Sequence, residues 1–265
     1  MKKIGFIGAG HMGFPLILGG IKAFGIENVT FAEKSEEVCA SVEKKTGLKH
    51  SESNAKLITD CDYIVLCVKP QFFKSVAADL KENLNVDKVI ISIMAGVSID
   101  DIKEATFPYQ KVIRVMPNTP AQVGAGMSCI SYNKKEVSED CVAVARKLLT
   151  TVGDVEEIDE KLMAAATCAN GSSPAYVYIF MEALADSLVK YGIPRALSYK
   201  LVGQTVLGSA KMLLETGEHP GELKDAVCSP SGTTIAGVSA LEEYGFRNAI
   251  IKATDACYEK ATHLK

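Results

Sequence analysis

Short runs of apolar residues alternate with longer amphipathic stretches along the chain as far as about residue 158. The run Tyr63–Val68 is apolar throughout, which is typical of a strand that a parallel sheet buries on both faces. Strands are predicted at Ile4–Ile7, Val29–Ala32, Tyr63–Val68, Lys88–Ile93, Val112–Val115 and Met127–Ser131. Helices are predicted between them at Ser35–Thr46, Phe72–Leu84 and Ser98–Ala105, the last capped by Ser98 with Asp101. The alternation predicts a doubly wound α/β domain.

The pattern changes near Asp159, because strand signals end there and long helical segments follow at Ala175–Tyr191 and Leu197–Glu215. The residues Tyr176–Met181 are consecutively apolar, so their helix has to be buried on several sides. Roughly a hundred residues cannot easily surround such helices, so we expect a second subunit to cover them. The alternative is burial against the chain's own first domain. We expect a dinucleotide-binding domain at 1–158 and a helical domain for dimerisation and substrate binding at 159–265.

A glycine motif follows the first predicted strand directly and precedes a helix-compatible apolar segment. Gly8, Gly10 and Gly13 fit the pattern G-x-G-x-x-G. In a dinucleotide-binding unit, the first glycine makes a tight turn, the second lets backbone approach a pyrophosphate and the third lets the helix pack closely. Free amides at the helix start favour the phosphate charge. The loop therefore predicts cofactor contacts from Gly8, Ala9, Gly10, His11, Met12 and Gly13; the alternative is a glycine-rich turn without a ligand.

The end of the second predicted strand bears on which cofactor is used. Glu33 lies about twenty residues after Gly13, where an acidic side chain can accept a hydrogen bond from the adenosine ribose of NAD. Lys34 and Ser35 follow at once and can hold a 2′-phosphate instead. Glu33 thus favours NADH and Lys34 with Ser35 favours NADPH, so the two interpretations conflict. A solvated charged turn without a ligand is the third alternative.

Two further loops follow predicted strands, where ligand crevices form in open α/β sheets. Val68-Lys69-Pro70 ends one strand, and Pro70 turns the chain away from the strand direction. Met116-Pro117-Asn118-Thr119-Pro120 ends another, and its two prolines imply a fixed shape suited to a wall beside the nicotinamide. A surface lysine at Lys69 and a purely structural turn after Met116 are the alternatives.

A cluster of small and hydroxyl residues, Ser229-Pro230-Ser231-Gly232-Thr233-Thr234, precedes apolar residues at helical spacing. It predicts a helix N-terminus whose first amides lack intrahelical partners and can bind a carboxylate. The hydroxyls of Ser229, Thr233 and Thr234 add donors. Ordinary helix capping, the alternative, accounts for only one or two of these residues.

Composition narrows the class of protein further. The chain has 265 residues, 48% of them hydrophobic, and a formal net charge of −3, which describes an ordinary globular protein without a basic run for nucleic acid. No apolar run approaches the roughly 20 residues that span a bilayer, and no signal peptide is recognised, so we expect a cytoplasmic protein without a membrane partner. The eight cysteines contain no C-x-x-C pair and no cluster with histidine, so no metal site is predicted.

With these motifs in place, the chain resembles the pyrroline-5-carboxylate reductase family over essentially its whole length. The resemblance rests on the fingerprint, Val68-Lys69-Pro70, Met116–Pro120, Ser172-Ser173-Pro174-Ala175-Tyr176 and the run Leu223–Thr234. It implies a Rossmann-type first domain and a helical second domain that interleaves with its partner in a homodimer, from which higher assemblies are possible. This chain departs from the family's usual residues at three positions: Ser231 and Ser173 replace glycine, and Glu33 replaces a small polar residue.

The resemblance implies NADPH as cofactor, with NADH also plausible because of Glu33, and a small-molecule substrate. It places Lys34 and Asn54 at the adenosine end of the cofactor and Ala95-Gly96 beside it. It also places Thr234 near the imine nitrogen as the catalytic residue, and Glu160 near the substrate, which Ser229, Gly232 and Thr233 also contact. The implied reaction is reduction of 1-pyrroline-5-carboxylate to L-proline, the last step of proline biosynthesis.

Two rival functions stay open at this point. A β-hydroxyacid dehydrogenase shares the layout but needs a lysine as general acid/base on the helix after a glycine-rich turn, and Pro174–Phe180 contains no lysine. A non-catalytic dinucleotide sensor is the other rival, and the predicted carboxylate site after Ser229 argues against it.

Overall fold

The structure is a computed structural model that describes residues 2–263. It divides into two compact units: residues 2–172 with 258–263, and residues 173–257. The predicted division after residue 158 concerns the functional domains and stays a prediction.

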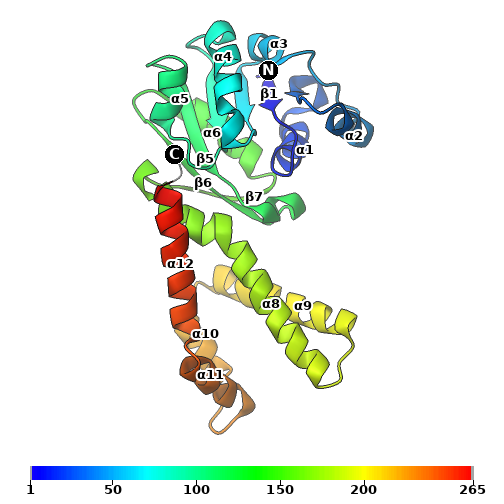
Figure 1. The fold of residues 1–265 in the computed structure, drawn as a ribbon, viewed down its shortest axis with the longest axis vertical. Coiled ribbons are helices and arrows are strands. Elements are labelled where there is room, and N and C mark those ends of the chain that lie inside the picture. Colours follow the sequence, from blue (N-terminus) through cyan, green and yellow to red (C-terminus); the bar gives the residue numbers. More distant parts are fainter. Residues whose placement is uncertain (1, 264–265) are drawn as a thin grey trace. The chain divides into compact units, whose positions relative to one another are not determined.

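The first unit contains one seven-stranded sheet in the order β2-β1-β3-β4-β5-β6-β7 (Figure 1). The strands are β1 (Ile4–Ile7), β2 (Val29–Ala32), β3 (Tyr63–Leu66), β4 (Val89–Ser92), β5 (Lys111–Met116), β6 (Gly126–Tyr132) and β7 (Gly153–Glu157). All neighbouring strands are parallel except β5 and β6. The sheet is therefore doubly wound around β1, which has β2 on one side and β3 on the other.

Helices cover both faces of this sheet (Figure 1). One face packs against α1 (Gly13–Phe24), α2 (Glu36–Thr46) and α6 (Glu139–Leu149), and the other against α3 (Asn54–Asp60), α4 (Phe73–Asn83) and α5 (Ile99–Ala105). Side chains of β3 alternate between the two cores: Tyr63 and Val65 join one, Ile64 and Leu66 the other. The continuous apolar run predicted a strand buried on both faces, and the structure confirms it.

The predicted elements differ from the observed ones chiefly at their ends and in omissions, which are α3, α6, β7 and the later helical segments Pro220–Ala226 and Phe246–Thr262. The predicted strand Tyr63–Val68 stops at Leu66, because the chain leaves the sheet there to form the loop that reaches Pro70. The sequence interpretation missed α3, a helix of 7 residues capped by Ser53, and β7, where Val155 is the buried residue among charged neighbours. Neither segment carries a hydrophobic period long enough to recognise. The predicted Ser98/Asp101 capping box is present.

A transition segment ends the first unit with a short α7 (Met163–Ala166) and a π-helix at Thr167–Ser172. The second unit is helical, as its residues predicted: α8 (Ser173–Lys190), α9 (Arg195–Thr216), α10 (Pro220–Ala226), α11 (Thr233–Glu243) and most of α12 (Phe246–Thr262). Its helices expose large apolar side chains in the single chain, among them Tyr178 at 58% and Ile179 at 65%. None of the helices within residues 2–263 has the length and apolar character needed to cross a membrane.

Candidate functional site

The crevice of the first unit lies where the strand order reverses. Loops that follow β1, β2 and β3 line one cavity of about 520 Å³, at the carboxyl ends of these strands. Parallel strands bind ligands at this point because their loops separate there and leave a crevice. The cavity brings together seven of the residues predicted to bind cofactor: Gly8, Gly10, Lys34, Ser35, Asn54, Val68 and Lys69.

The three fingerprint glycines have different surroundings that match three different roles. Gly8 has φ +97°, and a Cβ there would lie 2.9 Å from the carbonyl oxygen of Cys67. A Cβ at Gly13 would lie 2.3 Å from the carbonyl oxygen of Gly8, so α1 starts in direct backbone contact with the loop. A Cβ at Gly10 would meet no atom within 4 Å. The space beside Gly10 is therefore available to a ligand, whereas Gly8 and Gly13 are required by the fold.

The carboxylate of Glu33 is already held by backbone amides. Its Oε2 accepts a hydrogen bond from the Ala9 amide at 2.9 Å, and its Oε1 accepts from the Lys34 amide at 2.8 Å and the Ser35 amide at 3.1 Å. Ser35 is also the N-cap of α2, where its Oγ accepts from the Val38 amide. The half-buried Glu33 thus joins the loop after β1 to the turn after β2.

The remaining predicted cofactor residues of the first three loops are placed as follows. Ala9 and His11 line a neighbouring cavity of about 540 Å³ between the fingerprint loop and α2, and Met12 is the N-cap of α1. Asn54 is fixed by α4, since its Nδ2 donates to Oδ2 of Asp79 at 2.8 Å. Pro70 begins the short 3₁₀ turn Pro70–Phe72 that bends the chain away from β3.

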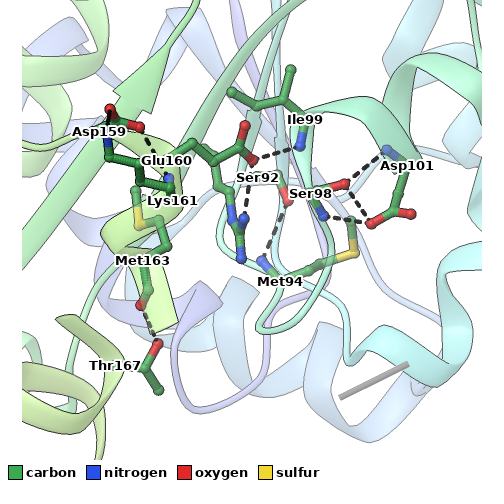
Figure 2. A network of polar contacts seen from close by, with 11 residues as sticks. Ser92, Met94, Ser98, Ile99, Asp101, Asp159, Glu160, Lys161, Met163 and Thr167 are labelled. Atoms are coloured by element: carbon green, nitrogen blue, oxygen red, sulfur yellow. Dashed lines mark hydrogen bonds and ion pairs between the residues drawn. The ribbon is translucent and has the colours of Figure 1, made fainter. Parts of the chain in front are cut away.

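A second group of predicted residues meets at a smaller cavity of about 260 Å³, lined by Ala95, Gly96, Arg114 and Glu160 among others. Figure 2 shows the carboxylate of Glu160 turned toward the backbone nitrogen of Ile99. Its Oε1 accepts from the Ile99 amide at 2.8 Å and from Nη1 of Arg114 at 3.0 Å. Glu160 therefore joins the start of α5 to β5, close behind the Ala95-Gly96 turn. Arg114 was missed because a single arginine in an apolar strand carries no motif.

The loop after β5 is fixed from two sides. Oδ1 of Asn118 accepts from the Met127 amide at 2.9 Å, and Nδ2 of Asn170 donates to the Met116 carbonyl at 2.8 Å. Asn170 belongs to the π-helix, a distortion that is frequent at functional sites, and its side chain is buried. Sequence reasoning missed Asn170, since a lone asparagine before a glycine indicates only a turn.

The predicted substrate residues lie in the second unit, around the start of α11. Gly232 is the N-cap of this helix, and no side-chain cap to α11 is found among the described residues. A Cβ at Gly232 would lie 2.3 Å from Oγ of Ser229, so a larger residue there would displace the Ser229 hydroxyl. Ser231 has φ +57°, a left-handed conformation that favours glycine and strains a serine. Ser229, Thr233 and Thr234 are exposed in the single chain, next to the first helical amides.

Thiol chemistry does not fit the crevice, although Cys67 lines it. Burial raises the pKa of the Cys67 thiol well above its ordinary value, so the thiol stays protonated and is a poor nucleophile. Within residues 2–263, no group of three or more His, Cys, Asp or Glu side chains is arranged to hold a metal ion.

A doubly wound domain with a glycine-lined crevice, followed by a helical unit, defines a class: two-part, dinucleotide-dependent oxidoreductases. Residues 160–264 match the family model for pyrroline-5-carboxylate reductase dimerisation, and residues 3–96 match that for coenzyme F420-dependent NADP oxidoreductases. The chain is 44% identical over 266 residues to pyrroline-5-carboxylate reductase of Escherichia coli (strain K12), a match covering 99% of this chain and 98% of that protein. The corresponding protein of Methanosarcina acetivorans is 43% identical, with 97% of each chain covered.

Among solved structures, the NADP-bound pyrroline carboxylate reductase of Plasmodium falciparum is similar with a TM-score of 0.89. It is 36% identical, and the match covers 99% of this chain and 98% of that one. The chain belongs to the pyrroline-5-carboxylate reductase family.

Proposed function

We propose that this chain reduces 1-pyrroline-5-carboxylate to L-proline with NADPH, the last step of proline biosynthesis. One observation carries the proposal: the chain is 44% identical to a reductase of this name, with 98% of that protein covered. The cavity at the strand-order reversal, with its glycine-lined wall, supports it because a dinucleotide pyrophosphate needs that open backbone.

The reaction adds a hydride to the imine carbon, so negative charge develops on the ring nitrogen, which takes up protons from solvent to become the protonated amine. Bound NADPH supplies the hydride. The chain's part is to hold the imine carbon against the nicotinamide, and such positioning contributes roughly 7–11 kcal/mol of a barrier. Pro117 and Pro120 stiffen the loop after β5, and Asn118 and Asn170 fix it by hydrogen bonds, so this loop suits a rigid wall beside the nicotinamide.

The start of α11 is proposed to hold the substrate. The amides of Thr233 and Thr234 begin α11, where N–H groups without intrahelical partners and the helix dipole favour a carboxylate, whereas the Gly232 amide donates to the Ser229 carbonyl at 3.0 Å. The hydroxyl of Thr234 is proposed to hydrogen-bond the ring nitrogen. A hydroxyl is a weak acid, so Thr234 orients the nitrogen and stabilises its developing charge rather than titrating.

Glu160 is proposed to act near the substrate. Its Oε1 already accepts hydrogen bonds from the Ile99 amide and from Arg114, so Glu160 is proposed to act by fixing the wall behind Ala95-Gly96.

A homodimer is proposed as the working unit, in the cytoplasm. The family model that matches residues 160–264 is one of dimerisation, which supports self-association. The exposed apolar side chains of α8 and α9, including Tyr178 and Ile179, require cover that a second copy can provide. The functional division is proposed to fall between residues 158 and 159.

The test is a spectrophotometric assay of NADPH oxidation with the purified chain. We expect oxidation with pyrroline-5-carboxylate and none with a β-keto acid. Oxidation only with the β-keto acid would favour the dehydrogenase alternative, and cofactor binding without oxidation of either substrate would favour the sensor alternative.

A further inference from the structure

The Glu33 carboxylate occupies the amides that an anion at the end of β2 would use. Three backbone N–H groups donate to it, those of Ala9, Lys34 and Ser35, at 2.8–3.1 Å. They come from two different loops, and the register of β1 and β2 explains why one side chain reaches both. Ile7 pairs with Ala32, and the Gly8 amide donates to the Ala32 carbonyl at 2.8 Å, so both loops leave the sheet side by side.

This carboxylate lies in the wall of the 520 Å³ cavity at the strand-order reversal. Glu33, Lys34 and Ser35 line the cavity together with Gly8 and Gly10. In a dinucleotide-binding crevice, the residues just after the second strand face the adenosine ribose. The amides of Lys34 and Ser35, the Lys34 ammonium and the Ser35 hydroxyl are donors suited to a phosphate on that ribose. Two of these donors, the amides, already bind an anion that the chain itself provides.

The bonding capacity of the carboxylate distinguishes the two cofactors. An ionised carboxylate has about four lone-pair positions, and three are taken by the amides. One remains, which suffices for a ribose 2′-hydroxyl that donates a hydrogen bond. A 2′-phosphate offers only acceptor oxygens and a charge of about −1.5 to −2, so it cannot bond to Glu33 and competes with it for the amides.

We infer that Glu33 sets the cofactor preference of this chain by acting as an internal anion. NADH is accepted with the three amide bonds intact, whereas the 2′-phosphate of NADPH gains the amides of Lys34 and Ser35 only when the carboxylate is displaced. Glu33 thereby narrows the preference for NADPH over NADH. The inference rests on the proposed function, since it takes the 520 Å³ cavity to be the dinucleotide site.

The experiment compares Glu33→Ser with Glu36→Gln as the matched control. Glu36 is the exposed first residue of α2, so its substitution removes one negative charge near the same turn without freeing an amide. Dissociation constants for NADPH and NADH are measured by titration without pyrroline substrate. We expect Glu33→Ser to bind NADPH roughly 5- to 30-fold more tightly than the parent and NADH no more tightly, with Glu36→Gln changing the ratio less than about twofold.

The inference would be overturned if Glu33→Ser had the same dissociation constant for NADPH as the parent, or if the ratio of the NADPH and NADH constants changed only because NADH binding was lost. It would also be overturned if Glu36→Gln changed that ratio as much as Glu33→Ser does. If Glu33→Ser fails to fold, Glu33→Gln serves as the test, because it retains one acceptor oxygen and the side-chain volume and is expected to move NADPH binding in the same direction. Failure of the proposed function looks different, since the unaltered chain would then not oxidise NADPH with pyrroline-5-carboxylate, whatever its two dissociation constants.

Discussion

Gly8, Gly10 and Gly13 share one motif, yet neighbouring atoms give each a different reason to be glycine. Backbone carbonyls exclude a side chain at Gly8 and Gly13, whereas a side chain at Gly10 would extend into open space. A similar distinction applies in the substrate loop, where a Cβ at Gly232 would meet the Ser229 hydroxyl, whereas Thr234 is exposed. Substitutions at residues with open space around them, such as Gly10 and Thr234, should change binding or turnover without changing the fold.

Gly10→Val is expected to abolish NADPH binding while leaving the thermal midpoint close to that of the parent, because the new side chain fills ligand space rather than protein space. Cofactor titration and thermal unfolding check the two halves of this expectation. Gly13→Ala is the contrasting variant: its Cβ would lie 2.3 Å from the Gly8 carbonyl oxygen, so its thermal midpoint should fall. Normal cofactor binding by Gly10→Val would show that the glycine motif is a structural turn that does not contact the cofactor.

Thr234→Ala is expected to lower kcat with little change in NADPH affinity. Losing one hydrogen bond to a developing charge costs about 1.5–3 kcal/mol, or roughly ten- to hundredfold in rate. Thr234→Ser keeps the hydroxyl and should retain most of the rate. Steady-state kinetics with both variants is the measurement, and turnover of Thr234→Ala within about twofold of the parent would remove Thr234 from the mechanism.

At the scale of elements, single carboxylates join pieces that lie far apart in the chain. Glu160 links β5 to the start of α5, as Figure 2 shows for its Ile99 end. Glu157 on β7 does the same for the far edge of the sheet. It pairs with Nζ of Lys134 at 2.7 Å, accepts from the hydroxyl of Tyr132 on β6 at 2.7 Å, and lies 3.5 Å from Nη2 of Arg146 on α6.

From these contacts we predict how the contribution of Glu157 to folding stability depends on pH. The hydrogen bond from Lys134, followed by that from Tyr132, lowers the pKa of Glu157 from its ordinary value of 4.5. A lowered pKa in the folded chain means that the stabilisation is present above 4.5 and is lost as the pH falls through the folded-state pKa. Glu157→Gln should therefore be less stable than the parent at neutral pH by about 0.5–1 kcal/mol, with a difference that shrinks in acid.

Urea unfolding across this pH range measures the effect. Glu156→Gln is the matched control, since Glu156 is the exposed neighbour on the same strand and lies outside the Glu157 cluster. A Glu157→Gln difference that stayed constant from neutral to acid pH would contradict the assignment of the stabilisation to the ionised carboxylate.

At the scale of the whole molecule, the two units differ in how completely they bury their apolar residues. The first unit has a core on each face of its sheet, whereas the second leaves Tyr178, Ile179 and Leu214 largely exposed in the single chain. A helix apolar on several sides is unstable in water without cover, so the second unit is where another subunit is expected to bind.

The chain is therefore expected to sediment as a dimer or larger at low micromolar concentration. Ile179→Lys places a charge on the apolar helix surface and should shift the chain toward monomer. Tyr109→Lys is the control, because Tyr109 is also a large exposed side chain, at 78% against 65% for Ile179, but lies on the first unit, so its substitution should leave the assembly unchanged. A stable monomer of the unaltered chain at that dilution would contradict the expected dimer.

The sequence alone determined the alternation of strands and helices in the first domain, the doubly wound class, the fingerprint loop and the family. These follow from local features: period, glycine spacing and motifs are written in consecutive residues. Among the elements it did not predict, α3 and β7 are short and lack a hydrophobic period of their own, and β7 owes its structure to pairing with β6.

Only the tertiary structure decided what individual polar side chains bond to. Sequence position suggested Glu33 as a ribose ligand, but the pairing of β1 with β2 brings the Ala9 amide to its carboxylate and leaves one lone-pair position. The roles of Arg114 and Asn170 in the site likewise follow from hydrogen bonds to Glu160 and to the Met116 carbonyl, which lie 46 and 54 residues away in the chain. Hydrogen bonds between distant segments depend on strand register and loop geometry, and no local pattern specifies either.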